Sequence, residues 1–221
     1  MKLAIVGYGK MGKLVAQLSP EHGFSIHAIV DADDDLAAAK GADAAIEFTS
    51  PEAALGNIER LAALGVPTVT GTTGWLDQMD RVKAVIAAND SALIWSANFS
   101  VGVNVLLRVV QEASRLLADD ASYEAWAWEI HHSAKKDAPS GTLLALVREM
   151  RAAGYTRHID QSANRAGKHP GTHEIGFDSA ADTITLRHTA RNREGFARGA
   201  LKAAQLIAGK KGVFEFKDLL G

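Results

Sequence analysis

The chain has 221 residues, no cysteine and a formal net charge of −2. This length is enough for one large domain or two small ones, and the nearly balanced charge excludes a global field that would attract nucleic acid or an anionic membrane. The lack of cysteine excludes disulfides, thiolate metal sites and thiol nucleophiles. No signal peptide or membrane-spanning apolar run is recognisable, so we expect a cytoplasmic protein without a nucleic-acid or membrane partner.

Short apolar runs alternate with helical patterns over the first hundred residues. The runs predicted to be buried strands are Leu3–Val6, Phe24–Val30, Ala44–Phe48, Pro67–Thr70 and Ala92–Trp95. The helices predicted between them are Met11–Ser19, Pro51–Leu64 and Leu76–Ala88. The link from Val30 to Asp43 is too short for more than one helical turn. Strands that alternate with helices indicate a parallel sheet covered on both faces, which is a Rossmann-type, doubly wound α/β fold.

The pattern changes after Asn98. The elements expected there are, in chain order, a helix over Val101–Leu117, a strand over Tyr123–Ile130, a helix from about Ser140 to Ala153, strands over His173–Asp178 and Thr183–Thr189, and a helix over Phe196–Ala208. Residues 155–172 are polar and contain glycine, so we expect a long loop there. We therefore expect a dinucleotide-binding domain of residues 1–98 and 193–221, and a smaller α+β domain of residues 99–192 with a mixed sheet.

A glycine-rich motif, G-x-G-x-x-G, follows the first predicted strand directly and opens a helix. Gly7 would allow the tight turn, Gly9 would let the backbone approach a pyrophosphate, and Gly12 would let helix and strand pack closely. The start of the helix offers free amides and a partial positive charge to phosphates. We prefer this interpretation to a purely structural turn, and assign to the cofactor site Gly7, Tyr8, Gly9, Lys10, Met11 and Gly12.

An aspartate, Asp31, ends the second predicted strand about twenty residues after the glycines. A carboxylate there accepts hydrogen bonds from the adenine ribose hydroxyls and repels a 2′-phosphate. Three more aspartates follow at positions 33–35, and no arginine or lysine occurs before Lys40. These charges favour NADH over NADPH as the cofactor; the alternative is an aspartate that only caps the next turn.

Two further loops follow strands four and five, at the carboxyl edge where open α/β sheets bind ligands. Their small side chains and exposed amides suit close approach of a nicotinamide ring, although each loop taken alone would be an ordinary turn. We assign to the cofactor site from these loops Gly71, Thr72, Thr73, Ser96, Ala97, Asn98 and Phe99.

The segment from Glu129 to Thr142 holds two histidines, two lysines and a Ser-Gly-Thr turn that opens an apolar helix. His131 and His132 follow an alternating strand, so their side chains point to opposite sides and can serve different purposes. The ammonium of Lys135 would lower imidazole basicity and attract an anion. The helix start is a cap, and its amides also form an anion site. The segment indicates a site that holds and protonates a small dicarboxylate.

Other interpretations of this segment remain open. The histidine pair could be structural, and the Ser-Gly-Thr turn could be only a helix cap. A zinc site is disfavoured because no cysteine is near and the lysines oppose a cation, so we expect no metal.

The motifs together resemble those of the 4-hydroxy-tetrahydrodipicolinate reductase family, also called dihydrodipicolinate reductases. The matching stretches are Gly7–Gly12, Glu47–Glu52, Thr70–Gly74, Ala97–Asn104, Glu129–Thr142, Arg165–Gly167, Gly171–His173 and Phe196–Ala200. The chain differs from the usual family pattern in its short Val30–Asp43 link and in Lys10, where arginine is commoner.

The resemblance implies an NAD(P)H-dependent oxidoreductase of lysine and diaminopimelate biosynthesis, which reduces 4-hydroxy-tetrahydrodipicolinate to tetrahydrodipicolinate. It implies that His131 is the general acid/base and Lys135 the proton donor. It also implies that His132, Gly141 and Thr142 bind the substrate carboxylates. Family members are usually homotetramers in which the second domains bind substrate and pair their sheets.

Two other functions remain as alternatives. One is a nicotinamide oxidoreductase that acts on another small amino or keto acid. The other is a noncatalytic nucleotide sensor, which would have no need of two histidines and a lysine beside an anion-binding helix start.

Overall fold

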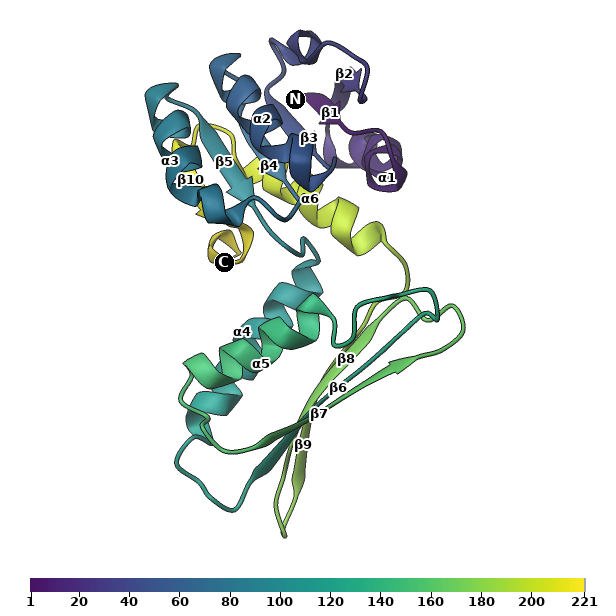
Figure 1. Cartoon of the computed structure of the whole chain (residues 1–221), viewed down its shortest axis with the longest axis vertical. Coiled ribbons are helices and arrows are strands. Elements are labelled where there is room, and N and C mark those ends of the chain that lie inside the picture. Colours follow the sequence, from purple (N-terminus) through teal and green to yellow (C-terminus); the bar gives the residue numbers. More distant parts are fainter. Residues whose placement is uncertain (221) are drawn as a thin grey trace. The chain divides into compact units, whose positions relative to one another are not determined.

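Figure 1 shows the computed structural model of the chain, which describes residues 1–220. The chain divides into two compact units, one formed by Met1–Ser100 together with Glu194–Gly221 and the other by Val101–Arg193. Among the described residues, none of the helices combines the length and the apolar character that a membrane crossing requires.

The first unit is built on a six-stranded parallel sheet with the strand order β10-β5-β4-β3-β1-β2. Its strands are β1 (Lys2–Val6), β2 (Ser25–Val30), β3 (Ala44–Glu47), β4 (Thr68–Thr70), β5 (Ala92–Trp95) and β10 (Gly212–Glu215). The chain goes from β1 to β2 on one side and then to β3 on the other side of β1. The carboxyl ends of β1 and β3 therefore flank the point where the strand order reverses, which is where such sheets bind ligands.

Helices cover both faces of this sheet (Figure 1). They are α1 (Lys10–Leu18) and α6 (Glu194–Leu206) on one face, and α2 (Pro51–Ala63) and α3 (Met79–Ala88) on the other. The central strands β3 and β4 are buried along their whole length because helices cover both faces of the sheet, and their residues are apolar except for Glu47 and two threonines. The short link between β2 and β3 holds a single 3₁₀ turn, Leu36–Ala39, which agrees with the prediction from its length.

The second unit is a four-stranded mixed sheet with the strand order β7-β6-β8-β9. Its strands are β6 (Glu124–His131), β7 (Ile159–Arg165), β8 (Thr172–Asp178) and β9 (Thr183–Thr189), and only β7 runs parallel to its neighbour. The helices α4 (Val101–Leu116) and α5 (Gly141–Ala152) pack together on one face of the sheet, around a core that includes Tyr155 and Phe177. No helix of residues 101–193 covers the opposite face (Figure 1).

The predicted fold class, a doubly wound parallel sheet with a smaller α+β domain, is confirmed. The prediction of a loop over residues 155–172 was wrong, because Ile159–Arg165 forms the edge strand β7. Only Ile159 of this strand is buried, and the polar residues that follow give no hydrophobic alternation; pairing with β6 creates the strand. Strand β10 was also missed, because it begins with glycine and none of its four residues is fully buried, so no continuous apolar run marks it.

Helix α6 packs against the backbone of the first unit so closely that one of its glycines is required. A Cβ atom at Gly199 would lie 1.7 Å from the carbonyl oxygen of Phe99, whereas a Cβ atom at Gly56 of α2 would meet no heavy atom within 4 Å.

We predict that Gly199→Ala lowers the free energy of unfolding by about 1–3 kcal/mol or more, because α6 must move away from Phe99. The matched variant Gly56→Ala should leave stability unchanged or raise it by up to about 1 kcal/mol, because alanine favours an exposed helix. Urea unfolding followed by circular dichroism measures both. Equal stabilities of the two variants would contradict the prediction.

Candidate active site

A cavity of about 460 Å³ lies at the carboxyl edge of the six-stranded sheet. Three loops line it, those that follow β1, β3 and β4, so it lies at the reversal of strand order. The lining residues are Gly9, Lys10, Met11, Phe48, Thr49, Pro51, Gly71, Thr72 and Thr73. Six of these were predicted from the sequence. The three from the β3 loop were missed, although that loop follows a buried strand in the same way as the other two.

The glycine loop has the form that a pyrophosphate requires. Gly7 has a φ of +89°, and a Cβ atom there would lie 2.1 Å from the carbonyl oxygen of Phe48. A Cβ atom at Gly12 would lie 2.0 Å from the carbonyl oxygen of Gly7. Gly9 faces open space beside the cavity, and α1 begins at the next residue. The loop therefore fits a phosphate bound to the backbone at the start of α1.

A buried carboxylate, that of Glu47, connects the loops after β3 and β4. Its Oε1 accepts hydrogen bonds from the backbone N–H of Thr49 at 3.0 Å and from the Thr72 hydroxyl at 3.1 Å. The hydroxyl of Thr70 donates to Oε2. These contacts hold Thr49 and Thr72 in the cavity wall, a role for Glu47 that was not predicted from the sequence.

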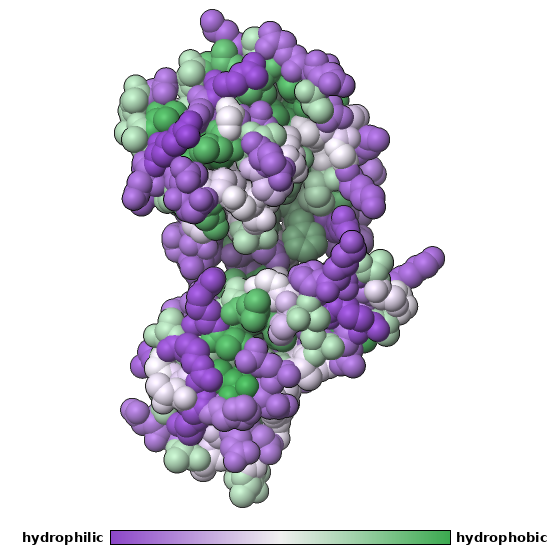
Figure 2. All heavy atoms as spheres, in the orientation of Figure 1, coloured by the Kyte–Doolittle hydropathy of each residue, from purple (hydrophilic) through white to green (hydrophobic). Residues whose placement is uncertain are grey.

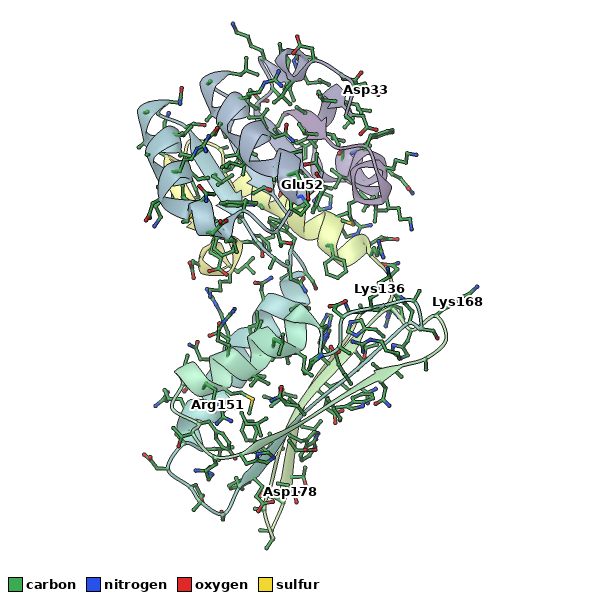
Figure 3. The ribbon with its side chains drawn as sticks, viewed as in Figure 1. Asp33, Glu52, Lys136, Arg151, Lys168 and Asp178 are labelled. Carbon is green, nitrogen blue, oxygen red and sulfur yellow. The ribbon has the colours of Figure 1, made fainter. Side chains whose placement is uncertain are left out.

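Asp31 lies in the turn after β2, as predicted. Its Oδ1 accepts from the backbone N–H of Ala32 at 3.1 Å, and the same acidic turn carries Asp33, which Figure 3 labels. The structure adds one cation to this region, because Arg60 of α2 pairs with Asp35 at 3.3 Å. Because the side chains of Arg60 and Asp35 are both exposed, this ion pair offsets the negative charge of the acidic turn only weakly.

The loop Ser96–Phe99 is not among the residues that line the cavity. The Ser96 hydroxyl donates to the carbonyl of Asn98 at 2.8 Å, which makes a compact turn. The ring of Phe99 is buried and lies edge-on to Phe48, with 6.3 Å between ring centroids. This loop thus supports the cavity from behind, through Phe48. Its assignment to the cofactor site remains a prediction.

In the second unit, three titratable side chains meet on the inner face of the sheet. Glu129 and His131 are two residues apart on β6, so both point to the same face, and His173 of β8 pairs with Glu129 in the ladder. All three are buried. The rings of His131 and His173 lie edge to face with centroids 5.0 Å apart.

The Glu129 carboxylate is the centre of this cluster. Its Oε1 accepts from the Arg165 guanidinium at 2.7 Å and from the backbone N–H of Ser140 at 2.8 Å, and the Ser140 hydroxyl donates to Oε2. The same hydroxyl accepts from the backbone N–H of Leu143 at 3.2 Å, so Ser140 is the N-cap of α5. Burial alone would raise the pKa of Glu129, but the hydrogen bonds from Ser140 and Arg165 hold it below its usual value.

Both buried histidines favour the neutral form. Burial lowers the pKa of His131, and the charges of Lys135 and Arg165 lower it further, while Glu129 and Asp137 oppose the shift. Burial, together with the neighbouring His131, lowers the pKa of His173 to about 4.

The loop after β6 carries the remaining predicted residues. His132 follows the strand directly, and its carbonyl accepts from the backbone N–H of Lys135 at 3.1 Å. The Lys135 ammonium lies 2.8 Å from each carboxylate oxygen of Asp137. Figure 3 shows Lys136 and Lys168 at this same end of the four-stranded sheet, so several cations lie at the end where β6 finishes.

The predicted substrate residues all belong to the second unit. Gly141 and Thr142 are the first two residues of α5, directly after the Ser140 cap that Glu129 holds. Backbone amides at a helix start bind anions. The arrangement can hold a carboxylate beside an imidazole and an ammonium group.

Glu129, His131 and His173 also have the donor types of a metal centre, with ligand atoms within 4.8 Å of one another. The guanidinium of Arg165 already supplies the positive charge at Glu129, at 2.7 Å. Lys135 adds a second cation that opposes a metal ion. We interpret the cluster as a hydrogen-bonded ion-pair network.

Comparison with known proteins matches both parts of the chain. Residues 1–99 match the family model described as "Dihydrodipicolinate reductase, N-terminus", and residues 102–220 match the one described as "Dihydrodipicolinate reductase, C-terminus". The chain is 35% identical to a 4-hydroxy-tetrahydrodipicolinate reductase of Christiangramia forsetii over 237 aligned positions, covering 100% of this chain and 98% of the relative. It is 40% identical to a reductase of the same name from an Anaeromyxobacter species over 209 positions, covering 85% of this chain and 77% of the relative.

A solved structure has the same fold. It is the dipicolinate-bound dihydrodipicolinate reductase of Paenisporosarcina sp. TG-14, which superposes with a TM-score of 0.88 at 20% identity. The superposition covers 100% of this chain and 99% of the other. Both units of the chain therefore have counterparts in one known architecture.

We predict that His173 makes stability depend on pH. Its pKa is about 4 in the folded chain and about 6.5 in an unfolded one, so the unfolded state takes up a proton that the folded state refuses. Above about pH 6.5 the histidine is neutral in both states and does not lower the free energy of unfolding. As the pH drops towards 4, protonation of the unfolded state lowers the free energy of unfolding progressively. Relative to His173→Gln, the wild-type chain should lose on the order of 2–3 kcal/mol more between pH 7 and pH 4 in urea unfolding. Parallel pH profiles of the two proteins would refute this.

Proposed function

Because the chain belongs to the dihydrodipicolinate reductase family, we propose that it reduces 4-hydroxy-tetrahydrodipicolinate to tetrahydrodipicolinate with a nicotinamide cofactor. This reaction is a step of lysine and diaminopimelate biosynthesis, which we place in the cytoplasm. The observation that carries the proposal is the cluster around Glu129, which holds His131 beside the Lys135 loop and the start of α5.

The first unit would bind the cofactor. The glycine loop and the amides at the start of α1 would hold the pyrophosphate, with the Lys10 ammonium beside it. Glu47 would keep Thr49 and Thr72 in place along the cavity wall. A nicotinamide cofactor supplies a hydride when bound.

The second unit would bind the substrate. The amides of Gly141 and Thr142 at the start of α5, together with His132, would hold the carboxylates. The surrounding ammonium groups would raise the local concentration of a dianion. In this proposal, residues 1–98 and 193–221 form the cofactor domain and residues 99–192 the substrate domain.

Protonation would complete the reaction. Negative charge that develops on the conjugated imine during reduction would be stabilised by the Lys135 ammonium. His131 or Lys135 would then deliver the proton, and general-acid help of this kind is typically worth about 10²–10⁴-fold. His131 is buried enough to have a lowered pKa, so its imidazolium would be a stronger acid than a free histidine.

A homotetramer would explain the uncovered face of the four-stranded sheet. Trp126 and Trp128 of β6 point to this face, since their neighbours in the strand point into the core. Large aromatic side chains on an unpaired face are typical of interfaces. The outer side of the helix pair is apolar as well, as Figure 2 shows, with exposed Val105 and Val109 on α4 and Leu144 on α5.

We predict that the chain oxidises NADH faster than NADPH, and only when freshly generated 4-hydroxy-tetrahydrodipicolinate is present. Asp31 would accept hydrogen bonds from the ribose of NADH and repel the 2′-phosphate of NADPH. Absorbance at 340 nm measures both rates, and Asp31→Ala should reduce the preference. Cofactor binding without substrate-dependent oxidation would instead favour another acid substrate or a nucleotide sensor.

We predict that His131→Gln and Lys135→Ala each lower kcat by about 10²–10⁴-fold, because each removes a group that handles the proton. Cofactor affinity, measured by fluorescence titration, should stay within about twofold, because both residues belong to the second unit. Lys202→Ala, an exposed lysine on α6, is the control and should keep wild-type turnover. Near-normal kcat in either variant would remove that residue from the mechanism.

A further inference from the structure

We propose that Glu129 is a positioning residue for proton transfer. Its carboxylate fixes the proton of His131 on Nδ1, so that Nε2 is the atom that exchanges a proton with the substrate, while Gly171 places no side chain against Nε2. This inference rests on the proposed role of His131 in the reduction.

The Nδ1 edge of His131 faces the carboxylate. Oε2 of Glu129 lies 3.6 Å from Nδ1, which is too long for a formed hydrogen bond but near enough for strong electrostatic interaction. Nδ1 is fully buried and has no hydrogen-bond partner in the structure. A carboxylate beside one ring nitrogen stabilises the tautomer that carries its proton there. The other nitrogen, Nε2, is then the basic one.

The carboxylate is held so that it cannot turn away from the ring. It accepts three hydrogen bonds, two from Ser140 and one from Arg165, and its side chain is completely buried. Arg165 also donates to the carbonyl of Asp137, in the loop that carries Lys135. One guanidinium therefore ties the carboxylate to the loop that brings the ammonium group towards the site.

Gly171 bounds the opposite edge of the ring. Its φ of +140° is a conformation that side chains rarely adopt. A Cβ atom there would lie 3.0 Å from Nε2 and 3.1 Å from Cδ2 of His131. Any larger residue would displace the ring or cover Nε2. A carboxylate at one edge and a missing side chain at the other thus define one orientation of the imidazole.

Glu129 is also the group that sustains a positive charge on His131. The charged groups that face this imidazole are Lys135 and Arg165, which disfavour its protonation, and Glu129 and Asp137, which favour it. His173, although 3.4 Å from Oε2, is neutral near pH 7 because burial lowers its pKa to about 4. Without the Glu129 charge, His131 would face two cations with only the more exposed Asp137 as compensation.

The competing explanation is that Glu129 only supports the fold, since it also holds the Ser140 cap of α5. The two roles differ in what they predict for His131. A structural role predicts a loss of stability, whereas a positioning role predicts a change in the tautomer and pKa of one imidazole.

The test is long-range ¹H–¹⁵N NMR of the histidine rings in the full chain, with His131→Gln to assign the signals. Wild-type His131 should be protonated on Nδ1 when neutral. In Glu129→Gln its pKa should fall by about one unit or more, because an opposite charge within 4 Å is lost. The limb of the kcat profile that falls with rising pH should move to lower pH by the same amount, and kcat should fall by at least about tenfold. The KM for the cofactor should stay within about twofold.

Three variants separate this role from the structural one. Ser140→Ala removes the cap and one of the three hydrogen bonds to the carboxylate but keeps the negative charge beside Nδ1, so it should lower stability and still leave His131 protonated on Nδ1. Glu112→Gln removes a carboxylate paired with Arg115 on the surface of α4. It should change neither the stability of the chain nor the tautomer of His131. Gly171→Ala should lower kcat because its Cβ meets the ring at Nε2.

An Nε2-protonated His131 in the wild-type chain would overturn the inference, and this outcome needs no variant. So would a folded Glu129→Gln protein with the wild-type pKa and tautomer. Failure of the proposed function is seen separately, because a wild-type chain that does not turn over the dicarboxylate would still give the NMR result. An active enzyme with the wrong tautomer would refute the positioning role alone.

Discussion

The ion pair between Glu129 and Arg165 is the contact on which the second unit depends. A carboxylate with no exposed surface is costly unless donors surround it, and here the donors come from separate elements. The two donor residues are Arg165, which ends β7, and Ser140, which caps α5; His173 of β8 lies 3.4 Å from the same carboxylate. The requirement to satisfy one buried charge therefore fixes the edge strand, the start of the helix and the central ladder against one another. The candidate chemistry is located where these constraints meet.

The first unit uses a similar device with different donors. Glu47 ends β3 with its carboxylate buried, and threonines from two loops supply the hydrogen bonds. Hydroxyl and amide donors hold this carboxylate, whereas in the second unit a guanidinium is one of the donors. In both units an acid at or near the end of a buried strand holds the loops that would touch a ligand. Such acids stabilise the geometry of a site without lining it.

Much of the fold and part of the site could be predicted from local sequence. The glycine motif specifies its own structure, because Gly7 and Gly12 each have backbone where a side chain would be. The polar strand β7 could not be recognised, since its partner β6 lies more than thirty residues earlier in the chain and no hydrophobic period marks it. For the same reason, the partners of Glu129 on β7 and β8 were invisible to spacing arguments. Arg165 and His173 come close to His131 only because β7 and β8 pair with β6 in the sheet.

The two ion pairs near His131 differ in a way that suits an exchange of ligands. Glu129 and Arg165 are 0% and 16% exposed, so separating them would leave a buried charge without a partner. Lys135 and Asp137 are 24% and 58% exposed, and pairs of this kind contribute only about 0–1 kcal/mol. A carboxylate that enters the loop competes with Asp137 for the ammonium and leaves the buried pair intact. The site can therefore accept an anion at Lys135 while the contact that orients His131 stays in place.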